Sequence, residues 1–98
     1  MAYIVHTVEE VKAYLRTFTG LSREGRLKLL GGYLDNLREH GDTFRSDPSA
    51  RHPQNNLLFF YTHIFRDGGQ TYVARFLVDD SAAAYGVLTV VYADCWSP

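Results

Sequence analysis

The sequence predicts an α+β domain: an N-terminal strand, then an antiparallel helix hairpin packed on a twisted, mainly antiparallel sheet, in the order β-α-α-β-β-β. Three observations support this class. Apolar residues recur twice at helical spacing between positions 8 and 40, three β-rich runs fill most of positions 57–96, and a stretch rich in Pro, Ser and Asn separates the two halves. With 98 residues and 46% hydrophobic content, the chain is long enough for one core, so we expect one domain over residues 1–98.

A short β-prone stretch at residues 3–7 predicts the first strand. The segment Thr7-Val8-Glu9-Glu10 fits a capping box, in which the threonine hydroxyl accepts a hydrogen bond from the backbone N–H of Glu10. Four apolar residues then follow at spacings of three and four: Val8, Val11, Leu15 and Phe18. This pattern predicts an amphipathic helix that Gly20 ends.

A second helix is predicted to begin after Ser22, a good N-cap residue, and to end near His40 and Gly41. Its apolar stripe consists of four leucines, Leu27, Leu30, Leu34 and Leu37. The short connection makes the two helices antiparallel neighbours. The pair Gly31-Gly32 costs roughly 1 kcal/mol per glycine relative to alanine, which indicates either close approach of another backbone or a break in the helix.

Residues 42–56 contain Pro48 and Pro53 and almost no apolar side chains, which predicts a long surface loop of a kind that is often functional. Three β-rich runs follow, at residues 57–66, 71–78 and 87 to about 96. The first two are joined by Asp67-Gly68-Gly69-Gln70, a glycine-containing hairpin signal.

Alternate positions in these runs differ in polarity, which predicts two unlike sheet faces. One set carries polar groups: Tyr61, His63, Thr71, Arg75 and Thr89. The other set is apolar: Phe60, Ile64, Phe76, Val78, Leu88 and Val90. We expect the helix hairpin to cover the apolar set and the polar set to lie on the opposite face.

Several classes of site are not predicted. The chain has a single cysteine, Cys95, so it cannot form an intrachain disulfide. We expect Cys95 to be a small apolar residue in a late strand. The four histidines show no metal-ligand spacing, and no phosphate-binding loop, dinucleotide fingerprint or serine nucleophile motif is present, so we predict no metal and no cofactor.

The longest apolar run, residues 57–61, is far shorter than the roughly 20 residues that cross a bilayer. Together with an N-terminus unlike a secretory signal, this predicts a cytoplasmic protein without a membrane partner.

The element order and one motif together resemble the RelE/ParE superfamily of toxins from bacterial toxin–antitoxin pairs. The motif is the run from Tyr72 to Asp80, followed by the apolar run from Val87 to Tyr92. The resemblance implies a cognate antitoxin as partner and, in its ribonuclease members, cleavage of mRNA on the ribosome. It also implies that Arg75 faces the scissile phosphate.

The sequence departs from the ribonuclease members in two respects. The chain has 10 Lys+Arg against 11 Asp+Glu and therefore lacks a surplus of positive charge for phosphate contacts. The C-terminal residues 93–98 contain no histidine, lysine or tyrosine, so only Tyr92 supplies a phenolic hydroxyl near this end of the chain. The gyrase-directed branch of the superfamily needs no nuclease residues, so the missing tail groups are compatible with that branch.

Cleavage of RNA by its ribose 2′-oxygen needs a base, a cation at the phosphate and an acid for the leaving oxygen. The candidate catalytic residues are Arg75 as the cation, His63 as base or acid, and Tyr92 as a hydrogen-bond donor. The candidate substrate-binding residues are Arg66, Tyr61 and Arg51. For each of them a structural role, such as a salt bridge or a cross-strand contact, is the alternative.

A second interpretation stays open, that of a noncatalytic interaction module or an inactive relative of these toxins. Seven tyrosines, six phenylalanines and Trp96 exceed what so small a core readily buries. The run from Leu57 to Tyr61 is apolar on both faces, so a partner could cover one of them. A homodimer through an open, aromatic sheet face is one form of this interpretation.

Overall fold

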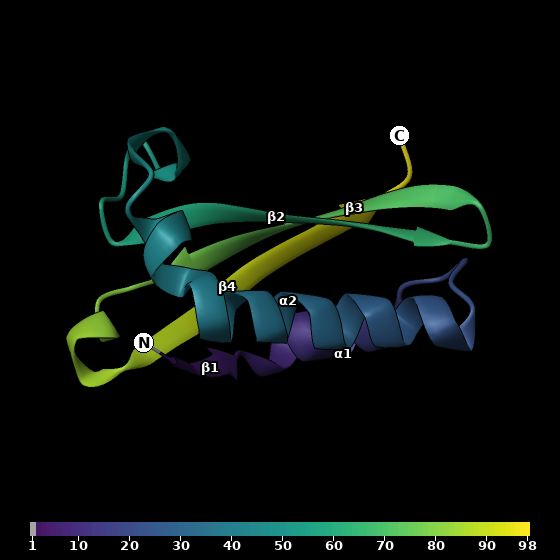
Figure 1. Ribbon diagram of the computed structural model, residues 1–98, viewed down its shortest axis with the longest axis horizontal. Helices are drawn as coiled ribbons and strands as arrows, with labels where there is room; N and C mark the ends of the chain where they lie inside the picture. Colours follow the sequence, from purple (N-terminus) through teal and green to yellow (C-terminus); the bar gives the residue numbers. More distant parts are fainter. Residues whose placement is uncertain (1) are drawn as a thin grey trace.

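The computed structural model describes residues 2–98, and its elements confirm the predicted class and the order β-α-α-β-β-β. The helices and strands are β1 (Ile4–Thr7), α1 (Glu9–Thr17), α2 (Arg23–Arg45), β2 (Leu58–Asp67), β3 (Gln70–Asp79) and β4 (Val87–Trp96). Two short 3-10 helices, η1 (Pro48–Ala50) and η2 (Ala83–Tyr85), lie in the connections. The strands run along the length of the molecule, and α2 runs beside them (Figure 1).

The four strands form one mixed sheet in the order β1-β4-β3-β2. β1 pairs with β4 in parallel, whereas β4 with β3 and β3 with β2 are antiparallel. The predicted hairpin between β2 and β3 is confirmed: Asp67 pairs with Gln70, and the two turn glycines have φ of 60° and 84°. Positive φ at both central positions is what a tight hairpin requires, and glycine adopts it without strain.

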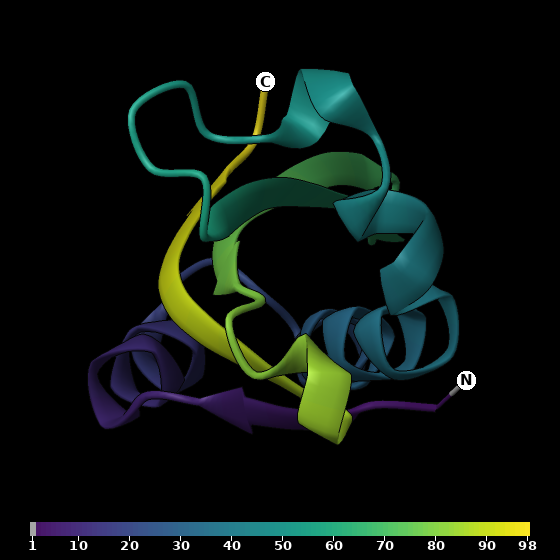
Figure 2. The same ribbon diagram turned by 90° about the vertical axis from the view of Figure 1, so that its left-hand side faces the viewer.

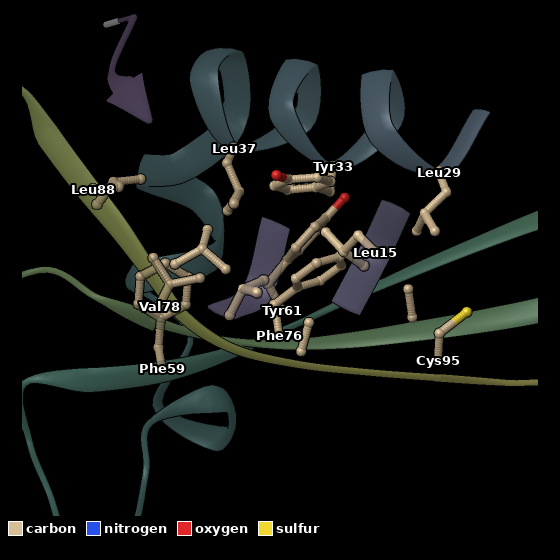
Figure 3. Close-up of a cluster of buried hydrophobic side chains, with 14 of the residues drawn as sticks. Leu15, Leu29, Tyr33, Leu37, Phe59, Tyr61, Phe76, Val78, Leu88 and Cys95 are labelled. Atoms are coloured by element: carbon tan, nitrogen blue, oxygen red, sulfur yellow. The ribbon is translucent and has the colours of Figure 1, made fainter. Parts of the chain in front are cut away.

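α2 fills the concave side of the sheet, which curves from β1 at the bottom of Figure 2 to β2 near the top. Its buried stripe consists of Leu29, Tyr33 and Leu37, whose side chains meet those of β2, β3 and β4 in the core (Figure 3). The predicted stripe is therefore wrong at its start, because Leu27 is 64% exposed. A pattern of leucines alone omitted Tyr33, whose ring stacks on Phe76 with centroids 4.7 Å apart.

The predicted N-cap of α2 is correct, since Ser22 Oγ accepts a hydrogen bond from the backbone N–H of Gly25 at 3.0 Å. The predicted end is wrong, because the helix continues past Gly41 to Arg45 with a kink at His40. Gly41 serves close packing instead of termination: a Cβ there would overlap the side chains of Leu88 and Tyr3. Four residues of the predicted loop are thus helical.

α1 occupies the edge of the sheet beyond the end of β1. β1 pairs only with residues 87–90 of β4. Beyond these residues α1 lies beside β4, and the hydroxyl of its Tyr14 accepts a hydrogen bond from the backbone N–H of Cys95 at 2.9 Å. The predicted capping box is absent, because Val8 is the N-cap residue without a side-chain bond. The Thr7 hydroxyl is instead hydrogen-bonded to the hydroxyl of Tyr33 at 2.9 Å, a tertiary contact that replaces the local one.

The two sheet faces agree with the prediction in β3 but are reversed in β2. We call the face toward α2 the inner face and the opposite one the outer face. Tyr61 pairs with Phe76 and is buried on the inner face, whereas Ile64 is 63% exposed on the outer face. In β4, a bulge opposite the Leu77/Val78 step lets Val90 and Ala93 both face the core. The outer face consists of Leu58, Phe60, Thr62, Ile64, Arg66, Thr71, Val73, Arg75, Leu77, Asp79, Thr89, Tyr92, Asp94 and Trp96.

Candidate functional site

Arg75 lies on the outer face of β3, with Thr62 of β2 opposite it on one side and Asp94 of β4 on the other. Its guanidinium carbon is 4.1 Å from the centroid of the Phe60 ring. Within residues 2–98 it forms no ion pair with a carboxylate. An exposed cation is thus held against an aromatic ring by a cation–π contact, with its charge available to a ligand.

Two hollows flank this pair, and both are lined by Phe60 and Arg75. The first hollow has a volume of about 390 Å³, and its lining includes Thr43, Phe44, Asp47 and Thr62. The second hollow has a volume of about 230 Å³, and its lining includes Leu77, Tyr92, Asp94 and Trp96. Arg75 and Phe60 therefore border both spaces.

The second hollow brings together one of the predicted pairs, Arg75 and Tyr92. Tyr92 is 54% exposed, and Trp96, four residues further along β4 on the same face, is 39% exposed. Asp94 lies between them in the strand, and its Oδ1 accepts a hydrogen bond from the Tyr14 hydroxyl at 3.3 Å. The hollow thus offers aromatic surface, one cation and one carboxylate.

The connection between α2 and β2 extends past the edge of the sheet beside the first hollow (Figure 2). Its His52 ring stacks on Phe60, with centroids 5.6 Å apart and planes inclined by 23°. His52 Nδ1 accepts a hydrogen bond from the backbone N–H of Gln54 at 3.1 Å, so the neutral ring carries its proton on Nε2. Phe60 therefore has Arg75 and His52 as neighbours.

Arg51, predicted to bind substrate, anchors this connection to the body of the fold. Its guanidinium forms an ion pair with the buried carboxylate of Asp80 at 3.0 Å and donates to the carbonyls of Arg45 and Asn56. Arg45 forms a second ion pair with Asp80 at 3.1 Å. The hydrogen-bonding capacity of Arg51 is thus used within the protein.

His63, predicted as the catalytic base or acid, lies on the inner face and is not brought to Arg75. Its Nε2 is 3.2 Å from the carbonyl oxygen of Lys28 in α2, and its ring stacks on Phe65 with centroids 5.6 Å apart. Burial lowers the pKa of His63, because the charged imidazolium loses its hydration there. This histidine packs between α2 and the sheet.

Tyr61 and Arg66 also lie apart from the centre of the outer face. Tyr61 is buried, its hydroxyl accepts a hydrogen bond from Asn36 Nδ2 at 2.7 Å, and burial raises its pKa. Tyr61 also contributes to the lining of the first hollow. Arg66 is exposed on the outer face near the β2–β3 turn, where it donates to the Gly69 carbonyl, and it lines neither hollow.

Four residues of the site were not predicted: His52, Phe60, Asp94 and Trp96. The strand register would have identified two of them: Asp94 lies directly opposite Arg75, and Phe60 is two residues from Thr62, the residue that pairs with Arg75 on the other side. His52 carried only the weak signal that long loops are often functional. Within residues 2–98, no group of three His, Cys, Asp or Glu side chains is arranged to hold a metal ion.

In chemical terms, the outer face offers a fixed cation between aromatic surfaces. This combination suits the phosphate and the bases of a single nucleic-acid strand. No helix within residues 2–98 has the length and apolar character needed to span a bilayer. Comparison of the chain with known protein families, with curated proteins and with solved structures finds no match.

Proposed function

We propose that this chain is a toxin-like protein of the RelE/ParE kind that acts on RNA, with a single RNA strand lying across the outer face. One observation carries the proposal: Arg75, stacked on Phe60, separates two hollows and has no carboxylate partner within residues 2–98. The element order, which agrees with the order that the resemblance implies, also supports it.

In this proposal Arg75 binds the phosphate between two nucleotides, and the hollows receive the nucleotides on either side. A guanidinium is planar and permanently charged, so it contacts two phosphate oxygens at once. The exposed rings of Tyr92 and Trp96 provide surfaces on which bases stack. Stacking supplies affinity without requiring many cations, which accommodates a net charge of −1.

The proposed reaction is cleavage by the ribose 2′-oxygen. This oxygen loses its proton to a base and attacks the adjacent phosphorus, the bond from phosphorus to the 5′-oxygen breaks, and an acid protonates that oxygen, leaving a 2′,3′-cyclic phosphate. Arg75 stabilises the extra negative charge of the pentavalent state. We propose His52 for proton transfer in place of His63, because His52 contacts Phe60 whereas His63 packs against α2.

The same proposal names the partners and the compartment. The chain would act in the cytoplasm on mRNA at the ribosome, and a cognate antitoxin would inhibit it by covering the outer face. The scheme uses side chains alone and requires no cofactor.

Induced expression in a bacterial host tests the function. We expect the wild-type chain to stop incorporation of labelled amino acids within minutes, and Arg75→Ala to remove most of this effect while remaining soluble and folded. Arg16→Ala is the matched control, since Arg16 is exposed on α1 and lines neither hollow. His52→Ala should weaken the arrest, whereas His63→Gln should retain it if the protein stays folded.

Other outcomes would contradict the proposal. Arrest of DNA synthesis before translation would point to the gyrase-directed branch of the superfamily. Arrest of translation that survives Arg75→Ala would remove Arg75 from the site.

A noncatalytic binding module is the second candidate, and the apolar character of the outer face favours it. Ile64, Tyr92 and Trp96 are all exposed on this face, and exposed aromatic side chains are typical of protein interfaces. Soluble expression without any arrest would favour this candidate. A homodimer through the outer face is its simplest form, and sedimentation of the purified wild type beside Tyr92→Ser would detect it.

A further inference from the structure

The second hollow holds a carboxylate, that of Asp94, between the exposed aromatic side chains of Tyr92 and Trp96. We propose that this hollow binds a guanine base of single-stranded RNA and that Asp94 recognises the Watson–Crick edge of the base. The inference rests on the proposed function, since it assigns the base that the RNA-binding face selects.

The hollow has a lining suited to one base. Its volume of about 230 Å³ gives room for a purine ring system. Tyr92 and Trp96 are its aromatic walls on β4, and Leu77 of the neighbouring strand β3 contributes to its lining. A base inserted here would stack on a ring and leave its edge facing a charged group.

Asp94 is positioned to be that charged group. It pairs directly across the strands with Arg75, yet the two side chains form no ion pair, because the Arg75 guanidinium lies over Phe60. The Tyr14 hydroxyl donates to one carboxylate oxygen, which helps to fix its position. The remaining lone pairs of the carboxylate are free for a ligand.

The chemistry of a carboxylate selects guanine among the four RNA bases. Ionised Asp only accepts hydrogen bonds, and its two oxygens accept from two adjacent donors. Guanine presents two such donors, N1–H and the N2 amino group, on its Watson–Crick edge. Adenine and cytosine present a donor beside an acceptor, and uracil presents one donor between two acceptors, so each would place an acceptor against the carboxylate.

Arg75 indicates that the base belongs to a strand and not to a free nucleotide. The same guanidinium lines both hollows, so a phosphate bound there has room for a nucleotide on each side. A strand whose guanine occupies the second hollow would continue past Arg75 into the first hollow. The free nucleotide would use only one of the two spaces.

Trp96 makes the binding directly observable, because it is the only tryptophan of the chain and lines the second hollow. We would titrate the purified full chain with the pentanucleotides UUGUU and UUAUU, both 2′-O-methylated so that no cleavage by the 2′-oxygen occurs. Quenching of Trp96 fluorescence should saturate for UUGUU at a concentration about tenfold lower than for UUAUU. Guanosine monophosphate should bind more weakly than UUGUU.

Asp94→Asn is the decisive variant. An asparagine amide offers one donor and one acceptor, and each of the four bases presents such a pair on its Watson–Crick edge, so the preference for UUGUU over UUAUU should be lost while both still bind. A merely structural role of Asp94 would not remove base selection from a folded protein that still binds both strands. Asp35→Asn, an equivalent change on the exposed face of α2, should keep the guanine preference.

Several results would overturn the inference. Equal affinity of the wild type for UUGUU and UUAUU would show that the hollow does not select guanine. Binding of guanosine monophosphate as tight as that of UUGUU would show that the ligand need not be an RNA strand. A guanine preference that persists in a folded Asp94→Asn protein would show that Asp94 does not recognise the base. Translation arrest that depends on Arg75 without any guanine preference would refute this inference and leave the proposed function intact, whereas guanine-selective binding without arrest would do the reverse.

Discussion

Gly32 of α2 faces the imidazole of His63 on β2 so closely that a Cβ at position 32 would overlap the ring. The glycine pair in this helix therefore has a steric cause at one position only, because the space around Gly31 is open. The sequence predicted close approach of another backbone, and the approaching group is a side chain. This contact brings α2 onto the sheet and keeps His63 on the inner face.

Alanine at these two neighbouring glycines should have opposite effects. Gly31→Ala should stabilise the protein by about 0.5–1 kcal/mol, because alanine favours the helix and nothing opposes its methyl group. Gly32→Ala should destabilise it by about 1–3 kcal/mol, because His63 must move. Urea unfolding of both variants measures the difference, and equal shifts would show that α2 does not pack on His63 in this way.

His63 should make the stability pH-dependent near neutrality. Burial lowers its pKa in the folded state, so the unfolded chain takes up this proton at a higher pH than the folded protein. The stabilisation is thus complete above the ordinary histidine pKa of about 6.5 and is lost as the pH falls below it. Urea midpoints between pH 5.5 and 7.5 should decline toward the acid end, less so in His63→Gln.

His40→Gln is the control for this titration, since His40 is exposed at the kink of α2. It should retain the wild-type pH dependence. A His63→Gln protein with an unchanged slope would assign the dependence to another group.

Asp80 should hold the connection between α2 and β2 in place. Its buried carboxylate pairs with Arg45 and Arg51, so Asp80→Asn leaves the partly buried guanidinium of Arg51 without an anion and Arg45 with only its 4.0 Å pair to Asp42, and it should cost about 3 kcal/mol. The connection should also become more sensitive to limited proteolysis, near Arg51. Asp35→Asn, which breaks only an exposed ion pair, should change the stability by less than about 0.5 kcal/mol.

Arg75 and Phe60 should be energetically coupled. A double-mutant cycle with Phe60→Leu and Arg75→Met should give a coupling free energy of about 0.5–1 kcal/mol in urea unfolding, the usual size of an exposed cation–π contact. In the expression assay, Phe60→Leu should weaken translation arrest, because the arginine is no longer held between the hollows. Additive stabilities would show that the two side chains do not interact in solution.

The order of the elements was predictable because its signals are local. Helical spacing, the Ser22 cap and the two turn glycines depend on residues close together in the chain, and each gave the correct element. The errors occur where a distant contact competes with a local one. Thr7 bonds to Tyr33 instead of capping α1, and Gly41 accommodates Leu88 and Tyr3 inside the helix instead of ending it.

The candidate site was only partly predictable for the same reason. Arg75 and Tyr92 are visible in the sequence as polar groups in strands, and both lie on the outer face. The sheet register then decided their neighbours. Pairing of Tyr61 with Phe76 turned Tyr61 and His63 inward, and it brought Phe60 against Arg75.

The sequence by itself thus determined which segments become helices and strands, their order and the presence of one arginine on a strand. Only the tertiary structure decided which face of β2 is inner and which is outer, because a shift of one residue in pairing moves every side chain to the opposite face. That choice depends on packing against α2 and on the bulge in β4, which no local pattern specifies. It placed His52, Asp94 and Trp96 beside the Arg75–Phe60 pair and excluded His63 from it.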